Sequence, residues 1–155
     1  MENGINTIAV YGDSILKGAI TGTDSGQLFE IIEENSLAIA AKKLCFELNN
    51  QSVFGSIAFK TQKRLNRDIR NGLCADLAII ESGGNDCDYD WSLVNEAPSA
   101  PHEMRTPLHD FIRIMSEMID TCRENKITPL VMTMPPLAAE RWFNHISRNF
   151  DKENI

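Results

Sequence analysis

The feature that most constrains the fold is a pair of short apolar runs, each of which leads into a glycine-containing polar turn. Residues 7–11 (TIAVY) are followed by 12–14 (GDS), and residues 76–81 (DLAIIE) lead through one serine into 83–86 (GGND). Runs of this length and composition are typical of strands buried on both faces. The carboxyl ends of parallel strands lie at the same edge of a sheet, and open α/β folds bind their ligands at that edge. We therefore expect a serine hydroxyl and a carboxamide to face each other there.

The segments between these runs carry helical patterns, so strands and helices alternate along the chain. The predicted strands are residues 7–11, 51–54, 76–81 and 127–134, and the predicted helices are residues 36–48, 57–71, 106–122 and 138–148. This alternation predicts a parallel sheet with helices on both faces. A flavodoxin-like strand order (second, first, third, fourth) would place the first strand beside the third.

Two segments lack a regular pattern. Gly18, Gly22 and Gly26 make residues 18–26 loop-like. Residues 86–105 contain two prolines and form a long polar loop. A loop of that length in a compact domain often carries function.

Composition and charge restrict the classes of partner. The chain has 155 residues, the length of one domain, and its net charge of −7 argues against a nucleic-acid or anionic-membrane surface. Residues 1–6 lack the features of a signal peptide, and no apolar run approaches the roughly 20 residues of a membrane span. The four cysteines are scattered without a C-x-x-C pair, which indicates a reduced, cytoplasmic protein. Cys45 and Cys122 fall on apolar helix faces and are expected in the core.

Ser14 is a candidate nucleophile because it follows a strand in a tight polar turn. A serine hydroxyl needs a base to remove its proton, and the oxyanion that forms on attack needs fixed hydrogen-bond donors. The available donors are the backbone N–H groups of Ser14 and Gly55 and the side-chain amide of Asn85. Each motif alone is also a good structural turn. Their order at three strand ends, serine, glycine and asparagine, favours a catalytic site.

These residues resemble the blocks of the SGNH or GDSL hydrolases. The GDS turn matches the first block, with Ile15 where leucine is usual; Gly55 matches the second, and GGND the third. Residues 85–91 and 135–143 resemble a bacterial GDSL-like lipase/acylhydrolase subgroup. The resemblance implies a three-layer α/β/α flavodoxin-like fold, an esterase or acylhydrolase activity, and no metal or cofactor. It implies that Ser14, Gly55 and Asn85 are catalytic.

Three further residues of the same blocks, Asp13, Gly84 and Asp86, are expected to contact the substrate. We expect that substrate to be a small-molecule ester, with neither a nucleic acid nor a membrane as partner. The sequence does not specify the acyl group or the alcohol.

The resemblance stops before the family's fourth block, Asp-x-x-His, which follows a fifth strand. No Asp-x-x-His occurs in this sequence. We therefore expect residues 1–155 to form a single domain that is C-terminally incomplete, with four strands present and the fifth missing. The free edge of strand 127–134 would favour a homo-oligomer. His102, His109 and His145 are expected at the surface, and His102 comes nearest to a substitute base because its loop leaves the GGND turn.

A serine esterase without its histidine is a weak catalyst. Losing that histidine costs about six orders of magnitude in kcat, and the oxyanion hole and binding alone retain roughly 10³ to 10⁴ over water. The chain is expected to be weakly active or inactive alone. The alternative is a non-catalytic acyl- or carbohydrate-binding module that keeps the pocket. Nucleotide binding is disfavoured, because neither G-x-x-x-x-G-K-[ST] nor G-x-G-x-x-G follows the first strand.

Overall fold

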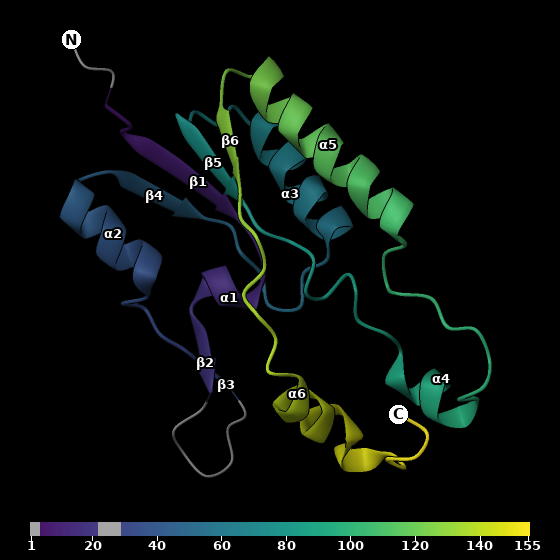
Figure 1. Cartoon of the computed structure of the whole chain (residues 1–155). Helices are drawn as coiled ribbons and strands as arrows, with labels where there is room; N and C mark the ends of the chain where they lie inside the picture. Colours follow the sequence, from purple (N-terminus) through teal and green to yellow (C-terminus); the bar gives the residue numbers. More distant parts are fainter. Residues whose placement is uncertain (1–3, 22–28) are drawn as a thin grey trace.

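The computed structural model describes residues 4–21 and 29–155 (Figure 1). Its main sheet has four parallel strands in the order β4-β1-β5-β6. The strands are β1 (Thr7–Tyr11), β4 (Glu47–Asn50), β5 (Leu77–Ile80) and β6 (Thr128–Val131). The flavodoxin-like order predicted from the sequence is confirmed, and β1 lies between β4 and β5.

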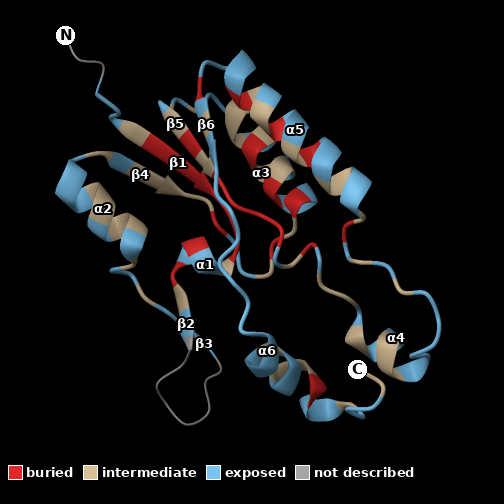
Figure 2. Cartoon of the chain, viewed as in Figure 1, coloured by how far each residue is buried: buried red, intermediate tan, exposed pale blue. Residues whose placement is uncertain are grey.

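Strand β1 is the centre of the sheet, and its side chains divide the core into two clusters. Ala9 and Tyr11 belong to one cluster, whereas Ile8 and Val10 belong to the other, as period-two alternation requires. All four side chains are buried, and Figure 2 shows β1 and β5 as the buried middle of the sheet. The carboxyl ends of β1, β4 and β5 consequently meet at one edge.

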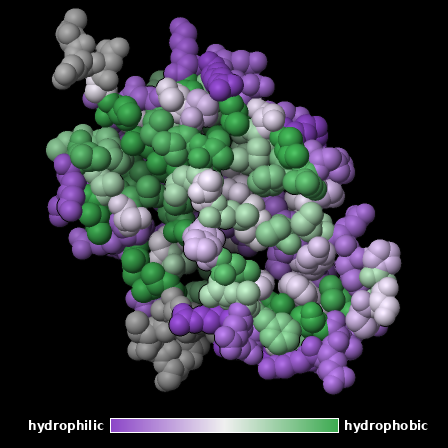
Figure 3. Space-filling model, in the orientation of Figure 1, coloured by the Kyte–Doolittle hydropathy of each residue, from purple (hydrophilic) through white to green (hydrophobic). Residues whose placement is uncertain are grey.

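Helices α3 (Ala58–Arg70) and α5 (Leu108–Glu124) lie together on one side of the sheet, and α2 (Ser36–Leu44) lies on the other side (Figure 1). Leu65 of α3 and Met118 of α5 are fully buried in the cluster that contains Tyr11. The opposite side is less covered, and Figure 3 shows hydrophobic side chains gathered there between α2 and α5. The three-layer α/β/α arrangement predicted from the sequence is thus present.

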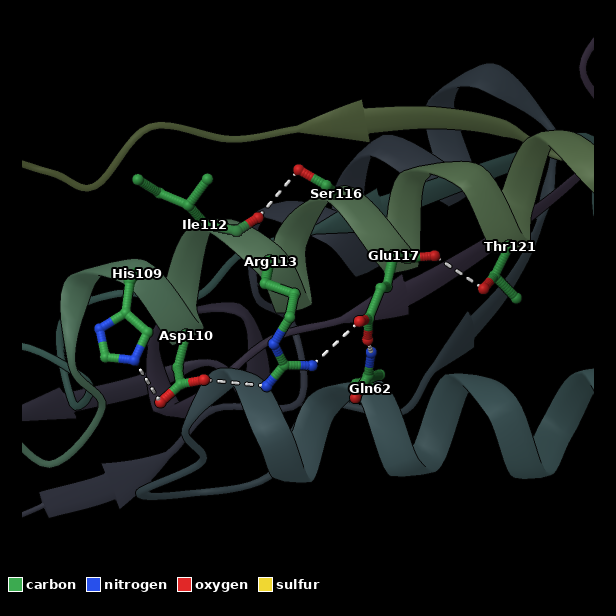
Figure 4. A network of polar contacts seen from close by, with 8 residues as sticks. All are labelled: Gln62, His109, Asp110, Ile112, Arg113, Ser116, Glu117 and Thr121. Carbon is green, nitrogen blue, oxygen red and sulfur yellow. Dashed lines mark hydrogen bonds and ion pairs between the residues drawn. The ribbon is translucent and has the colours of Figure 1, made fainter.

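An outer polar network joins α3 to α5 (Figure 4). Gln62 of α3 donates to the carboxylate of Glu117 at 2.7 Å. On α5, Arg113 donates to Glu117 at 2.9 Å and to Asp110 at 3.0 Å. Solvent screens such exposed contacts, so they contribute little, and the buried apolar contacts remain the main attachment.

A short antiparallel hairpin replaces part of the loop expected at residues 18–26. Strand β2 (Ala19–Thr21) pairs with β3 (Phe29–Ile31). Gly18 ends the preceding short helix α1 (Ser14–Lys17) with φ +94°, and a Cβ there would lie 2.8 Å from the carbonyl oxygen of Ile32. Gly22 and Gly26 lie outside the described residues.

The helix predicted over residues 36–48 is too long. Helix α2 ends at Leu44, and Cys45 follows with φ +56°. Leu48 belongs to β4, where it pairs in register with Ile8 of β1. Pairing with a distant strand overrides the local helical pattern here. The strand expected at 51–54 is correspondingly wrong, since β4 precedes it.

Cys45 is exposed and not in the core as expected, whereas Cys122 is buried as expected. The difference follows from the position of each cysteine in its helix. Cys45 lies beyond the last turn of α2, but Cys122 lies within α5 and points into the cluster around β1.

The later part of the chain differs from prediction in the loop after the GGND turn and in the bounds of three elements. The long polar loop contains α4 (Trp91–Glu96), whose first turn is capped by the carboxylate of Asp90. Helix α5 begins at Leu108, because the Thr106 hydroxyl bonds elsewhere. Strand β6 is shorter than predicted, and α6 (Ala139–Ile146) is followed by the 3₁₀ turn Ser147–Asn149.

Within residues 4–21 and 29–155, no helix combines the length and the apolar character needed to cross a bilayer.

Candidate active site

The turn after β1 is held in place by its own aspartate. Asp13 is 3% exposed, and its Oδ1 accepts from the backbone N–H of Ile15 at 2.9 Å, which caps α1. Ser14 is therefore the first residue of α1 and is half-buried. Among the described residues, none forms a hydrogen bond with the Ser14 hydroxyl.

Asn85 joins the three turns at this edge of the sheet. Its Nδ2 donates to Asp13 Oδ2 at 2.8 Å and to the backbone carbonyl of Ser56 at 3.1 Å. The structure thus brings Asn85 next to the residue that precedes Ser14, and next to the residue that follows Gly55. The three sequence blocks meet as the parallel sheet predicts.

The candidate oxyanion donors differ in whether they already form hydrogen bonds within the described part of the chain. In the described part of the chain, no residue accepts a hydrogen bond from the backbone N–H of Ser14 or of Gly55. Gly55 has φ +66° and open space where a Cβ would stand. Both hydrogens of Asn85 Nδ2, by contrast, already have acceptors within the chain. Asn85 can donate to a substrate oxygen only by sharing or releasing one of them.

Asp86 ties the turn to two helices. It is 2% exposed, and its carboxylate accepts from the backbone N–H of Ala58, at the start of α3, at 2.9 and 3.1 Å. It also accepts from the hydroxyl of Thr106 at 2.6 Å, just before α5. These contacts fix the GGND turn between α3 and α5. Substrate contact by Asp86, and by Asp13 and Gly84, stays a prediction.

Glu81 is a site residue that the sequence reasoning did not identify. It is 1% exposed, its Oε2 accepts from the backbone N–H of Asp13 at 3.1 Å, and its Oε1 has no partner among the described residues. Burial, followed by the charge of Asp13, raises the pKa of Glu81 to about 7. A Cβ on Gly12 would lie 3.0 Å from Oε2, so the glycine leaves room for this carboxyl. The signal in the sequence was an acidic residue closing an apolar strand.

Arg64 supports the same turns from α3. Its Nη2 donates to Ser56 Oγ at 2.8 Å, and more distantly to Thr61 Oγ1 at 3.3 Å and the carbonyl of Gly12 at 3.4 Å. Burial is the main cause that lowers the pKa of Arg64, with the neighbouring Arg67 charge second. The sequence predicts only that Arg64 lies in a helix over residues 57–71, and the three-dimensional fold reveals its inward contacts.

Each of the three histidines contacts a described residue other than Ser14. His102 Nε2 lies 2.8 Å from the carbonyl of Ala97, and His109 lies beside Asp110 on the outer face of α5 (Figure 4). His145 stacks on a neighbouring tryptophan of α6. The described residues also contain no group of three or more His, Cys, Asp or Glu side chains arranged to hold a metal ion.

A small apolar hollow of about 150 Å³ lies beside the GGND turn. The lining residues are Gly83, Asp86, Cys87, Met104, Thr106, Leu108, Phe111 and Met134. Gly83 has φ +136°, and a Cβ there would lie 2.7 Å from the sulfur of Met134. The hollow therefore depends on glycine at this position.

Comparison with known proteins gives matches among solved structures alone, since neither a family model nor a curated protein matches the sequence. A lipase/acylhydrolase from Enterococcus faecalis is 18% identical, over 89% of this chain and 62% of its own, with a TM-score of 0.62. The psychrotrophic esterase EstA from Pseudoalteromonas sp. is 17% identical over 94% and 73%, with a TM-score of 0.55. A GDSL-like lipase from Bacteroides thetaiotaomicron is 16% identical over 84% and 49%, with a TM-score of 0.52.

The present chain thus spans 62% of the Enterococcus protein and about half of the Bacteroides protein. At these identities the likeness concerns the fold. It agrees with the resemblance found in the sequence blocks and with the parallel sheet flanked by helices. The chain has the fold of the SGNH/GDSL lipases and acylhydrolases of known structure.

Proposed function

We propose that this protein belongs to the serine esterases, and that it cleaves acyl esters through Ser14. The observation that carries the proposal is the meeting of three turns at one sheet edge, with the N–H groups of Ser14 and Gly55 unengaged beside Asn85. The solved structures with this fold include a lipase/acylhydrolase and an esterase, which supports hydrolysis of ester bonds in general.

In the proposed reaction, Ser14 Oγ attacks the acyl carbon, and its proton passes through solvent to the alcohol, which leaves when the tetrahedral intermediate collapses. Water then attacks the acyl group on Ser14, releases the carboxylic acid and restores the hydroxyl. The N–H groups of Ser14 and Gly55 stabilise the oxyanion, together with Asn85 Nδ2. Removing one donor of this kind typically costs about 2.7–4 kcal/mol of transition-state stabilisation. Of the two contacts of Asn85, the longer one, to the Ser56 carbonyl at 3.1 Å, is the one that we expect to yield.

The hollow beside the GGND turn suits a short acyl group. Its volume of about 150 Å³ is well below the roughly 300–1,000 Å³ of sites that hold drug-sized ligands. Because its walls are largely apolar, it offers no partner for a charged or hydroxylated acyl chain. We propose acetyl to butyryl esters as the preferred acyl groups.

The 155-residue chain is proposed to be a slow catalyst. No described residue contacts the Ser14 hydroxyl as a base, and serine hydrolases lose about six orders of magnitude in kcat without their histidine. The same observation favours a second function, a non-catalytic module that binds an acyl or carbohydrate ligand at this edge.

Fluorophosphonate labelling and p-nitrophenyl acetate turnover separate the two functions. We expect labelling at Ser14 that reaches one label per chain when imidazole supplies a base, and a slow hydrolysis that imidazole accelerates and Ser14→Ala abolishes. Ser99→Ala, in an exposed loop, serves as the matched control and keeps the wild-type rate. A rate that Ser14→Ala leaves unchanged contradicts the esterase; saturable ligand binding without labelling supports the binding module.

A further inference from the structure

Two stretches outside the catalytic blocks come together in space. One is the segment after the GGND turn and the other is α6 with the turn that follows it, and between them lies a groove of about 640 Å³. Four aromatic side chains line it: Tyr89, Trp91, Trp142 and Phe150. Figure 3 shows hydrophobic and hydrophilic side chains interleaved around α4 and α6, unlike the apolar face of the sheet.

The first wall of the groove is held by internal contacts. Trp91 Nε1 donates to Asp88 Oδ1 at 2.8 Å, and Arg105 Nη2 lies 3.3 Å from Asp88 Oδ2. The rings of Tyr89 and Trp91 pack edge to face, with centroids 5.7 Å apart. These contacts hold the side chains of this wall in one arrangement.

The second wall is tied to the first. Trp142 and His145 of α6 are stacked, with ring centroids 5.7 Å apart and planes 24° apart. The backbone N–H of Asp151 donates to Asn95 Oδ1 at 3.1 Å, and Asn154 Nδ2 donates to the Asn95 carbonyl at 3.2 Å. Because Asn95 lies in α4, these bonds fix the distance between the two sides of the groove.

We propose that this groove binds a neutral carbohydrate, which forms the alcohol part of the ester substrate. The inference rests on the proposed function and names its substrate class. Flat aromatic faces pack against the C–H faces of a sugar ring, while the carboxylate of Asp90, the guanidinium of Arg105 and the imidazole of His145 suit its hydroxyl groups. Its volume lies in the range of about 300–1,000 Å³ found for small-molecule sites.

Charge and position both favour this ligand over the alternatives. A net charge of −7, with acidic residues at the groove, disfavours an anionic ligand, and a purely apolar ligand would remove the polar groups of the groove from water without hydrogen-bonding to them. The groove also begins close to the reacting atoms in sequence: Asp88 is three residues after Asn85. The wall that contains Asp88 thus continues directly from the turn that contains Asn85, and backbone bonds from Arg105 to Asp88 and from Thr106 to Asp86 join the two.

The chain carries its own reporter for this site. It has two tryptophans, Trp91 and Trp142, and both line the groove. We would titrate the full chain with xylobiose or cellobiose, whose rings have flat apolar faces and equatorial hydroxyls, and follow tryptophan emission. Saturable change with a disaccharide, and none with hexanoate, is the expected result.

The matched pair of variants is Trp142→Ala and Phe143→Ala, adjacent residues of α6 of which Trp142 alone lines the groove. Trp142→Ala should weaken binding of the disaccharide about tenfold or more, and the emission of the remaining Trp91 measures this loss. Phe143→Ala should bind the disaccharide like wild type. Circular dichroism checks that each variant is folded. Should Trp142→Ala unfold the chain, Arg105→Gln, which removes the guanidinium from an exposed loop, takes its place.

No emission change with either disaccharide would overturn the inference. So would equal binding of hexanoate, or unaltered binding by a folded Trp142→Ala variant. Fluorophosphonate labelling of Ser14 is measured in the same samples and does not depend on the groove. Labelling without sugar binding therefore refutes the carbohydrate site alone, whereas sugar binding without labelling refutes the esterase.

Discussion

The carboxyl of Glu81 lies behind the turn that carries Ser14, and its burial makes its charge state part of the site. Its Oε2 accepts a hydrogen bond from the backbone N–H of Asp13, and the carboxylate of Asp13 in turn accepts one from Asn85. When Glu81 is protonated, its carboxyl group is neutral and no longer repels the carboxylate of Asp13. The proton can then sit on Oε1, the oxygen that has no partner among the described residues. The raised pKa of about 7 reflects this preference for the protonated form.

Glu81→Gln should therefore abolish one part of the pH dependence of stability. The folded pKa of Glu81, about 7, lies above the ordinary glutamate value of 4.5. Its contribution is fully present below about pH 4.5 and is lost as the pH rises through 7. Glutamine imitates the protonated acid, so urea unfolding should show the variant gaining on the order of 1–3 kcal/mol over wild type between pH 5 and pH 8. Asp13 and Asp86, the other charges that face Glu81, are common to both proteins. An equal pH dependence in the two would contradict the assignment.

Gly83 and Gly72 provide a residue-scale test of the apolar hollow. Both have positive φ, +136° and +86°, but a Cβ at Gly83 would lie 2.7 Å from Met134 Sδ, whereas Gly72 has open space. Thermal unfolding should show that Gly83→Ala loses about 1–3 kcal/mol more than Gly72→Ala. Equal losses would mean that the thioether of Met134 moves aside freely.

At the scale of elements, the sequence predicted β1 correctly because its short apolar run leads directly into the polar turn at residues 12–14. It also predicted the strand order, since alternation of strands and helices restricts the topology. The boundary between α2 and β4 was missed. The apolar stripe of α2 continues in phase to Leu48, but backbone pairing with β1 decides the structure there. The hairpin β2–β3 has strands of three residues, too short for any period to be visible.

The residues of the candidate site also fall into those that the sequence predicts and those that it does not. The positions of Ser14, Gly55 and Asn85 follow from strand ends, which are visible in sequence. The supporting contacts of Glu81 and Arg64 are not visible, because they join residues that are 68 and 52 positions away from their partners. Such contacts exist only after the sheet and α3 have packed.

Asp86 couples two elements, and a double-mutant cycle measures that coupling. Asp86→Ala leaves the buried N–H of Ala58 and the hydroxyl of Thr106 without an acceptor, so we expect a loss of about 1–3 kcal/mol in unfolding free energy. Thr106→Val removes the hydroxyl at similar volume. If the Asp86–Thr106 bond at 2.6 Å holds α5 to the turn, urea unfolding should give an interaction energy of about 0.5–3 kcal/mol. Additive losses would show that the two residues act independently.

For the whole molecule, the two sides of the sheet are unequally covered. Helices α3 and α5 bury one side, while β6 at the edge stays accessible (Figure 2). Leu130 and Val131 are neighbours in β6 and so point to opposite faces, yet they are 43% and 46% exposed. Pro129, which has no N–H, lies in the same strand and weakens it as a template for pairing.

This uncovered edge predicts self-association of the 155-residue chain, in keeping with the homo-oligomer expected from the sequence. An exposed apolar edge strand is a ready partner for another copy, and a charge on such a strand blocks pairing. Val131→Lys should therefore shift the apparent mass toward the 17.4 kDa monomer in light scattering over a dilution series. The control is Leu93→Lys, which places the same charge on an exposed position of α4, 55% accessible and away from the sheet. Wild type that stays monomeric at every concentration, or association that Val131→Lys leaves unchanged, would show that β6 is not the contact. A fall in mass with Leu93→Lys as well would show that the effect is not specific to β6, since either lysine changes the net charge equally, from −7 to about −6, which lessens repulsion between copies.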